Sequence, residues 1–325
     1  MKRILLTILL LTLFAACDND RKENEPETVY WKTYTLDNSA LINNFVNCVA
    51  VDSDDHIWAG NYYGDMTEFD GAEWTHHMIT EPAPYNSTVN KLAVDNQNAV
   101  WAMSDNSLFH LNNGVWTQVT NASFNFLSDF SIASDNSVFA VRNTYGNNFW
   151  HYASGSWTNL DNSYLLQNLR KLAVTIDGRV WIGGYNQLSY YSSGTIVSYT
   201  TANSGLPGRD IISITVDGVN KVWVGTSTSG LASFDQYSWT TFNTGNSGLP
   251  SNQVQVIAFD RYNHLWVGTD HGVAFYDNNQ WTVYNTENSG LLSNYITGIA
   301  LDSKNNVWIA TFGGGLSAFN ENGIK

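Results

Sequence analysis

The chain has 325 residues, with 29 acidic and 15 basic side chains, so its formal charge at neutral pH is −14. Without the first sixteen residues, which hold two of the basic side chains, 13 basic and 29 acidic residues remain and the charge is −16. Nucleic acids and anionic membrane surfaces would repel so acidic a chain, and we expect neither as a partner.

Residues 1–16, MKRILLTILLLTLFAA, combine two basic residues, an apolar run and small residues at the end. This pattern predicts a secretory signal peptide, because the apolar run is too short for a mature transmembrane helix. The following segment, Leu13-Phe-Ala-Ala-Cys17, resembles the lipobox of bacterial lipoproteins. The resemblance implies that the mature chain starts at a lipidated Cys17 and touches the membrane only through acyl chains. Ordinary cleavage beside an incidental cysteine is the alternative.

Residues 18–28, DNDRKENEPET, are rich in charge and almost free of apolar side chains, so we expect residues 17–28 to form a lipidated, disordered tether. An acidic run after such a cysteine resembles the signals for outer-membrane or cell-surface display. We therefore expect an outer-membrane lipoprotein on its periplasmic or surface side. If Cys17 is lipidated, Cys48 has no partner for a disulfide within the chain, and it should pack as a small hydrophobic residue.

From residue 41 to 319 the sequence repeats one unit, which has four short runs rich in Val, Ile, Phe, Tyr and Trp between Asp, Asn and Gly turns. Such a unit predicts a four-stranded antiparallel meander. The second strand carries an aromatic residue every 38 to 43 positions: Trp58, Trp101, Phe139, Trp181, Trp223, Trp266 and Trp308. The fourth strand has its own series: Trp74, Trp116, Trp157, Ile196, Trp239 and Trp281. Seven such units predict a single all-β domain over residues 29–325, a seven-bladed β-propeller.

The fourth-strand series has no member near the C-terminus, because the chain ends at Lys325. A β-type run at residues 29–35 precedes the first unit, and its Trp31 lies 43 residues before Trp74. We therefore predict that the N-terminal segment supplies the outermost strand of the last blade. This pairing would close the ring and protect the last edge.

Three units resemble the repeats of the two-component regulator propeller family. Each has Asn-Ser-Gly before Leu206-Pro, Leu249-Pro or Leu291-Leu, and then Val222-Trp-Val-Gly-Thr226, Leu265-Trp-Val-Gly-Thr269 or Val307-Trp-Ile-Ala-Thr311. The likeness is specific over the C-terminal half and weaker over the first three units. The family is known mainly as periplasmic sensor modules of hybrid histidine kinases, where paired propellers respond to oligosaccharides. With one propeller and no kinase here, the resemblance implies ligand binding without signal relay through this chain.

In a propeller, the loops that enter the innermost strands share one face with the loops that join the second and third strands. The latter loops carry the candidate ligand-binding residues Tyr62, Tyr63, Tyr145, Tyr185, His271 and Phe312. Aromatic faces near Asn and Asp suit sugar rings, although such rings can also simply cap blade edges.

One residue into each innermost strand lies a mostly polar series: Asn47, Asn90, Ser128, Arg170, Ile212, Gln255 and Thr297. Two positions further on the series is apolar: Val49, Leu92, Phe130, Leu172, Ile214, Ile257 and Ile299. We predict a hydrated channel mouth above a dry interior, with Arg170 as the one charge in the polar ring. Arg170 is a further candidate for ligand contact, or else a solvated side chain.

No metal site, cofactor or catalytic residue is predicted. The acidic run at residues 52–55 lacks the glycine and glutamate of a helix-loop-helix calcium site. Acidic residues recur after the innermost strands and should form turns: Asp52, Asp95, Asp217, Asp260 and Asp302. His76 and His77 are neighbours on a strand, so they point to opposite faces and cannot easily share a metal. Several acids lie near the channel face with His271, but no spacing singles out an acid/base pair: Asp65, Asp105, Asp129, Asp210 and Asp270.

The sequence therefore predicts a monomeric, non-catalytic envelope lipoprotein that binds a glycan or oligosaccharide on the channel face. Two alternatives stay open. One is a protein–protein scaffold in an envelope complex, and the other is a propeller lyase or hydrolase.

Overall fold

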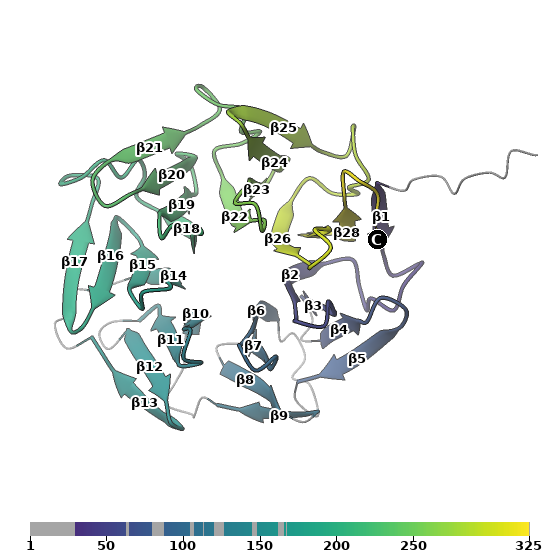
Figure 1. Ribbon diagram of the computed structural model, residues 1–325, viewed down its shortest axis with the longest axis horizontal. Helices are drawn as coiled ribbons and strands as arrows, with labels where there is room; N and C mark the ends of the chain where they lie inside the picture. Colours follow the sequence, from purple (N-terminus) through teal and green to yellow (C-terminus); the bar gives the residue numbers. More distant parts are fainter. Residues whose placement is uncertain are drawn as a thin grey trace, which may run out of the picture.

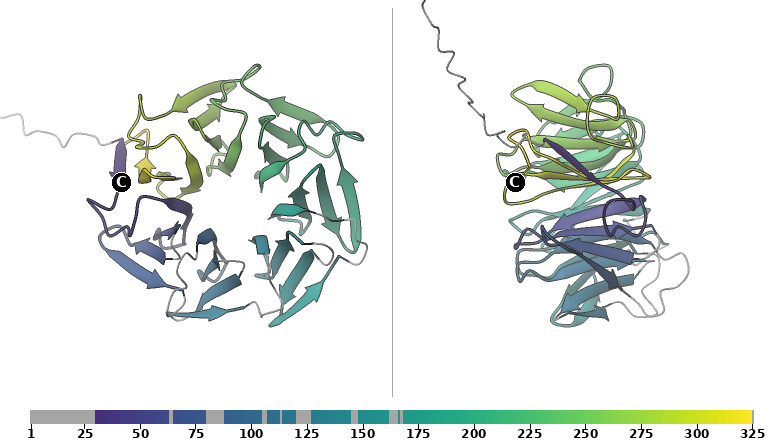
Figure 2. Two further views of the ribbon diagram at one scale, coloured as in Figure 1. Left: turned by 180° about the vertical axis from the view of Figure 1, so that it is seen from behind. Right: turned by 90° about the vertical axis from the view of Figure 1, so that its right-hand side faces the viewer.

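The computed structural model describes residues 30–62, 65–79, 88–104, 107–112, 114–119, 127–144, 148–161, 166 and 168–324. Over these residues, twenty-eight strands form seven four-stranded antiparallel sheets around a central axis (Figures 1 and 2). The prediction of an all-β, seven-bladed propeller is confirmed. The described part of the chain contains no helix that could cross a membrane. The predicted leader and tether, with Cys17, lie outside the described residues.

Each blade runs from an innermost strand at the channel to an outermost strand at the rim. The innermost strands of blades 1 to 7 are β2 (Val46–Val51), β6 (Val89–Val94), β10 (Leu127–Ile132), β14 (Leu169–Val174), β18 (Ile211–Val216), β22 (Val254–Phe259) and β26 (Ile296–Leu301). The second strands are β3 (Ile57–Asn61), β7 (Val100–Ser104), β11 (Val138–Arg142), β15 (Val180–Gly184), β19 (Val222–Thr226), β23 (Leu265–Thr269) and β27 (Val307–Thr311).

The third strands are β4 (Asp65–Phe69), β8 (Ser107–Asn112), β12 (Phe149–Ala153), β16 (Gln187–Ser192), β20 (Leu231–Phe234), β24 (Gly272–Asp277) and β28 (Gly315–Phe319). The outermost strands are β5 (Trp74–Met78), β9 (Val115–Gln118), β13 (Ser156–Asn159), β17 (Thr195–Tyr199), β21 (Trp239–Phe242), β25 (Gln280–Tyr284) and, for blade 7, β1 (Trp31–Tyr34). Successive strands alternate in direction, so the turns of one kind all reach the same face.

The ring closes as predicted, because the N-terminal strand β1 pairs with β28 near the C-terminus (Figure 1). Trp31 lies opposite Phe319 and Tyr34 lies opposite Leu316 in this ladder. Thr33 adds a side-chain hydrogen bond from its Oγ1 to the carbonyl of Gly290, at 2.6 Å. The first and last parts of the sequence therefore build one blade together.

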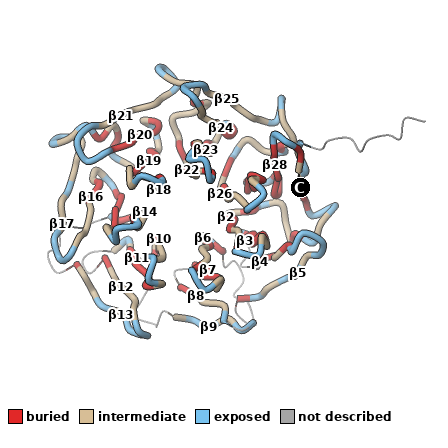
Figure 3. Tube along the Cα trace, in the orientation of Figure 1, coloured by how far each residue is buried: buried red, intermediate tan, exposed pale blue. Residues whose placement is uncertain are grey.

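The core lies between neighbouring blades, and burial is deepest along the second strands (Figure 3). All seven marker aromatics of these strands are 9% exposed or less. Each hydrophobic cluster draws on two blades. Trp101 and Met103 of blade 2, for example, pack with Phe130 and Val138 of blade 3. The stability of each blade therefore depends on its neighbours.

The recurring aspartates form the turns between innermost and second strands, and they also hold the marker tryptophans. In four blades the carboxylate accepts two backbone N–H groups and the indole N–H six residues on, with indole distances of 2.9 to 3.0 Å. These pairs are Asp52–Trp58, Asp95–Trp101, Asp217–Trp223 and Asp302–Trp308. In blade 6, His264 takes the second oxygen of Asp260 instead, and the indole N–H of Trp266 has no partner among the described residues.

Cys48 packs in the cluster between blades 1 and 2, as expected of a small hydrophobic residue. Burial raises the pKa of its thiol to about 12. At pH 8 only about one thiol in 10,000 would then be ionised. We expect Ellman's reagent to leave Cys48 unmodified in the folded chain lacking residues 1–17, and to titrate one thiol after denaturation. Rapid stoichiometric reaction of the native protein would show that Cys48 is accessible.

Candidate functional site

The polar series around the channel coincides with a β-bulge in every blade. The register between the innermost and second strands shifts at the second residue of each innermost strand. The bulged residues are Asn47, Asn90, Ser128, Arg170, Ile212, Gln255 and Thr297. A β-bulge changes the direction of a side chain, so the side chains at these seven positions do not follow the simple alternation of a regular strand.

Part of this polar series has a structural role, because it ties one blade to the next. Ser128 Oγ donates to the carbonyl of Leu169 at 3.0 Å, and Thr297 Oγ1 donates to the carbonyl of Val46 at 2.5 Å. These bonds satisfy buried backbone acceptors at the ring's inner edge. A polar residue at the bulge is therefore not by itself evidence for a ligand.

Two hollows lie on the channel. The hollow at the mouth measures about 710 Å³, within the range of small-ligand sites. Its lining comprises Asn47, Tyr62, Thr88, Asn90, Arg170, Lys171, Ile212, Gln255, Tyr295, Ile296, Thr297 and Phe312. A deeper hollow of about 220 Å³ is lined partly by the apolar series, including Val49, Leu92, Ile214, Ile257 and Ile299. These five apolar side chains lie deeper in the channel, as predicted, but Lys91, Asp129 and Lys171 line the same hollow, so its lining is mixed and not the dry interior that we expected.

Four aromatic side chains gather at the mouth where blades 1 and 7 meet: Phe45, Tyr62, Tyr295 and Phe312. We call them the mouth aromatic cluster. The ring of Phe312 lies 4.8 Å from Phe45, 6.1 Å from Tyr62 and 6.0 Å from Tyr295, measured between centroids. All four side chains remain 37–44% exposed. Backbone hydrogen bonds from Tyr62 to Phe45 and from Phe312 to Tyr295 fix the loops that carry them.

The charged residues that line the two hollows come from blades 2, 3 and 4. Arg170 forms an ion pair with Asp210 at 3.0 Å, with its side chain 41% exposed. Lys91 pairs with the buried Asp129 at 2.7 Å, and Asp129 also accepts the backbone N–H of Leu172. Lys171 lines both hollows and pairs with no carboxylate in the described part of the chain. Among the described residues that line the two hollows, Lys171 is thus a positive charge without an ion-pair partner.

The structure brings three of the predicted site residues together. Tyr62, Arg170 and Phe312 all line the mouth hollow. Tyr185 is half exposed, and its backbone bridges to Asp210, but it lies outside the lining. Tyr63 and Tyr145 fall outside the described residues.

His271 is exposed on the loop between β23 and β24, and its Nδ1 lies 3.0 Å from Asp270 Oδ1. It does not line the mouth hollow. Burial alone would raise the pKa of Asp270, but hydrogen bonds from Ser251 and His271 outweigh it and the pKa is lowered. An ionised Asp270 beside an imidazole is an acid/base pair of the kind left open above.

Sequence reasoning missed Phe45, Tyr295 and Lys171. Phe45 and Tyr295 stand in equivalent positions, directly before the innermost strands β2 and β26. The loops that enter the innermost strands belong to the predicted channel face. Comparing the residues directly before these strands in every repeat could therefore have identified Phe45 and Tyr295. Lys171 follows Arg170, and only the bulge lets two successive residues both reach the hollow.

Comparisons with known proteins agree with this architecture. Residues 40–63, 248–271 and 290–313 match the model of the two component regulator propeller family. The first of these segments lies in the first unit, where the likeness had looked weak. No curated protein matches the sequence.

Solved structures share the fold at low sequence identity. The extracellular domain of a B. thetaiotaomicron protein assigned to the hybrid two-component systems has 21% identity and a TM-score of 0.74, covering 91% of this chain and 42% of that one. Virginiamycin B lyase from Staphylococcus aureus has 13% identity and a TM-score of 0.72, covering 89% and 98%. PorZ of Porphyromonas gingivalis, a surface component of the type-IX secretion system, has 16% identity and a TM-score of 0.67, covering 86% and 47%. The chain thus spans less than half of the sensor domain and of PorZ, and it is a seven-bladed β-propeller that carries two-component regulator propeller repeats.

Proposed function

We propose that this protein is a non-catalytic, exported binding protein whose channel mouth holds a glycan or oligosaccharide. The mouth aromatic cluster is the observation that carries the proposal. Three aromatic rings lie within about 6 Å of the ring of Phe312, and all four residues stay more than a third exposed at a hollow of about 710 Å³. Aromatic faces stack on the C–H faces of sugar rings, and exposed aromatics in a concave site are typical of ligand recognition.

Polar groups around the hollow complement the aromatic cluster. The amides of Asn47, Asn90 and Gln255 line it and can exchange hydrogen bonds with sugar hydroxyls. Gln255 already donates to the Tyr295 hydroxyl at 2.8 Å, which orients both groups toward one another. Arg170 keeps part of its guanidinium exposed beside Asp210. A ligand with one apolar face and many hydroxyls matches this lining.

Export and membrane anchoring belong to the same proposal. The N-terminal signal and the lipobox-like Leu13–Cys17 support an outer-membrane lipoprotein with the propeller on its periplasmic or surface side. The protein shares its fold with the extracellular domain of a B. thetaiotaomicron protein, which is consistent with that location.

The test uses the chain without residues 1–17, since all strands lie within Trp31–Phe319. A glycan array followed by calorimetry should find a sugar that binds saturably. We expect Tyr62→Ala and Phe312→Ala each to weaken binding roughly tenfold, the effect of losing about 1.4 kcal/mol of ring contact. Tyr237→Ala is the matched control, because Tyr237 is an aromatic that is 95% exposed on the turn between β20 and β21, away from the mouth.

Two outcomes would redirect the proposal. Equal affinity in wild type, Tyr62→Ala and Phe312→Ala would move the sugar site away from the mouth. Release of cleaved products, abolished by His271→Ala, would instead establish the lyase or hydrolase alternative at the Asp270–His271 pair.

If no sugar binds, the scaffold alternative becomes the leading one. It is favoured by apolar side chains on successive turns of the face opposite the mouth. Ile176, Val219 and Tyr262 are 59–75% exposed on the turns of blades 4, 5 and 6. A backbone N–H of the blade 4 turn donates to Asn220 of blade 5, and one of the blade 5 turn donates to Asn263 of blade 6, so the three turns are joined side by side. Exposed apolar patches of this kind mark protein contacts.

A further inference from the structure

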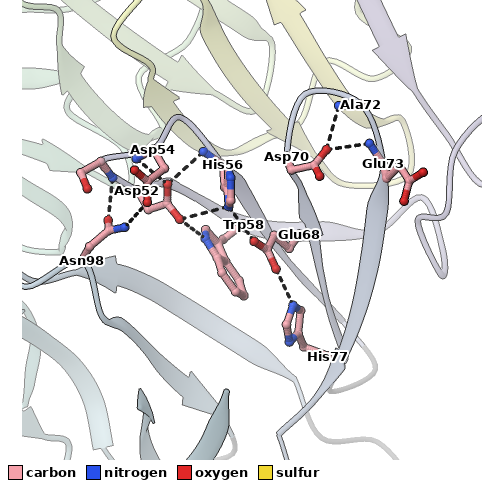
Figure 4. A network of polar contacts seen from close by, with 11 residues as sticks. Asp52, Asp54, His56, Trp58, Glu68, Asp70, Ala72, Glu73, His77 and Asn98 are labelled. Carbon is pink, nitrogen blue, oxygen red and sulfur yellow. Dashed lines mark hydrogen bonds and ion pairs between the residues drawn. The ribbon is translucent and has the colours of Figure 1, made fainter. Parts of the chain in front are cut away.

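Blade 1 gathers two histidines and two carboxylates beside its β2–β3 turn and on the strands next to it, and each comes from a different strand or strand end. Asp52 follows β2, His56 precedes β3, Glu68 lies on β4 and His77 lies on β5. Figure 4 shows Glu68 between the two imidazoles, with Asp52 beside His56. These four residues, here named the blade 1 His/carboxylate cluster, have no part in the candidate site at the mouth.

The distances within the cluster are those of a compact polar centre. Glu68 Oε1 lies 2.7 Å from His56 Nδ1, and Glu68 Oε2 lies 2.8 Å from His77 Nε2. His56 Nδ1 also lies 3.7 Å from Asp52 Oδ2. One ligand atom each of Asp52, His56 and Glu68 can be chosen so that all lie within 4.8 Å of one another. Ligand atoms around a tetrahedral zinc ion, at about 2.0–2.2 Å from the metal, lie roughly 3.3 Å apart.

We propose that the blade 1 His/carboxylate cluster binds a divalent transition-metal ion of the Zn²⁺ class, with Asp52, His56 and Glu68 as ligands and His77 as the outer residue that orients Glu68. Imidazole nitrogen with carboxylate oxygen is a donor set that suits zinc. Glu68 Oε1 faces His56 Nδ1, so the ion would take the place of the proton between these two atoms, while His77 holds the other oxygen of Glu68.

The surroundings hold the ligands in place. Asp52 accepts the backbone N–H groups of Asp54 and His56 and the indole N–H of Trp58, so its carboxylate is oriented before any ion arrives. The ring of His77 lies 4.8 Å from that of Trp58, which restricts its rotation. Outer contacts of this kind raise metal affinity because the ligands lose little freedom on binding.

The propeller fold does not require these side chains, because the other blades do without them. Opposite the marker aromatic, where blade 1 has Glu68, the other blades have His110, His151, Tyr190, Ser233, Phe275 and Ala318. Two residues before the marker, where blade 1 has His56, they have Ala99, Ser137, Arg179, Lys221, His264 and Asn306. Only blade 1 combines both positions into a donor set. A bound ion would link the end of β2, the start of β3 and β4 in the blade that follows the ring closure.

The test is titration of the chain lacking residues 1–17 with ZnCl₂, purified without a polyhistidine tag. Removing Cys17 leaves Cys48 as the one cysteine, and it is buried, so no thiolate competes for the ion. We expect calorimetry to find one zinc equivalent and the melting temperature to rise with added zinc, since binding to the folded state alone stabilises it. Visible absorption of bound Co²⁺ would report the coordination geometry.

His77→Ala and Glu68→Gln are each expected to weaken zinc binding roughly tenfold or more. His76→Ala is the matched control, because it removes the neighbouring histidine on the same strand, which points to the other face. Circular dichroism and gel filtration check that each variant folds. Absence of binding by folded wild type would overturn the proposal, as would loss of the equivalent in His76→Ala together with its retention in His77→Ala.

Discussion

Replacing Trp266 by alanine is expected to lower the free energy of unfolding by roughly 3–5 kcal/mol, the usual cost of removing a large buried side chain. Trp266 is 4% exposed and packs between blades 6 and 7. Its ring centroid lies 4.6 Å from that of Phe275 and 5.9 Å from that of Phe319. The cavity would therefore open in the interface that holds two blades together. Urea unfolding followed by circular dichroism measures the loss.

A pair of phenylalanine variants separates packing from hydrogen bonding at this repeat position. Trp223 donates its indole N–H to Asp217, whereas the indole N–H of Trp266 has no partner among the described residues. Trp223→Phe should therefore cost about 1.5–3 kcal/mol more than Trp266→Phe, the value of a hydrogen bond to a charged group. Equal costs of the two substitutions would mean that the hydrogen bond from Trp223 to Asp217 contributes nothing.

For the alanine variant, an unchanged melting temperature of Trp266→Ala would show that the side chain of Trp266 is not buried.

The architecture was predictable because each unit repeats its own local signals. The spacing of Trp58, Trp101 and their counterparts counts the blades, and the Asp, Asn and Gly turns separate the strands. Ring closure by the N-terminal strand was predictable from Trp31, because this residue completes the fourth-strand aromatic series, which has no member in the last unit. The burial of all seven marker aromatics follows from the same repetition, since each of them packs against the equivalent part of the next blade.

The candidate site was predictable only in part, because it depends on contacts between blades. Topology alone placed Tyr62 and Phe312 on the channel face. That their rings meet Phe45 and Tyr295 follows from ring closure, which joins residues near opposite ends of the sequence. The ion pairs of Arg170 and Lys91 likewise cross from one blade to the next. A pattern within one unit carries no information on such pairs.

The blade 1 cluster shows the same limit at the level of strand register. Alternation along a strand correctly separates His76 from His77, and on that ground no metal site was expected there. The partners of His77 are not on its own strand, however. Glu68 reaches it diagonally from β4, where Met66 is the residue directly opposite His77. Only the three-dimensional register brings the two histidines to one carboxylate.

Removing the closing strand is expected to have the largest effect of all. A chain that starts after Thr35 lacks β1, and with it Trp31 and Tyr34. Trp31 packs on Phe319 at 4.6 Å, and Tyr34 packs on Phe69 of blade 1 at 5.4 Å. Burying two such side chains is worth roughly 3–6 kcal/mol, a large share of the stability of a typical domain. Because β28 would also become an unpaired apolar edge, we expect the truncated chain to aggregate or to melt at a much lower temperature.

A synthetic peptide of residues 29–38 provides the control, because it can restore the missing ladder without any other change. Added to the truncated chain, it should raise the melting temperature and return the protein to the monomeric fraction in gel filtration. A peptide with Trp31→Ala and Tyr34→Ala keeps the backbone hydrogen bonds but loses the two rings, and should rescue less. If the truncated chain remained monomeric with an unchanged melting temperature, β1 would contribute nothing to stability, and the other contacts between blades 1 and 7 would be enough to hold the ring closed. The structure favours closure by β1, since Tyr34 contacts both Phe69 of blade 1 and Trp308 of blade 7 and so spans the seam between the first and the last blade.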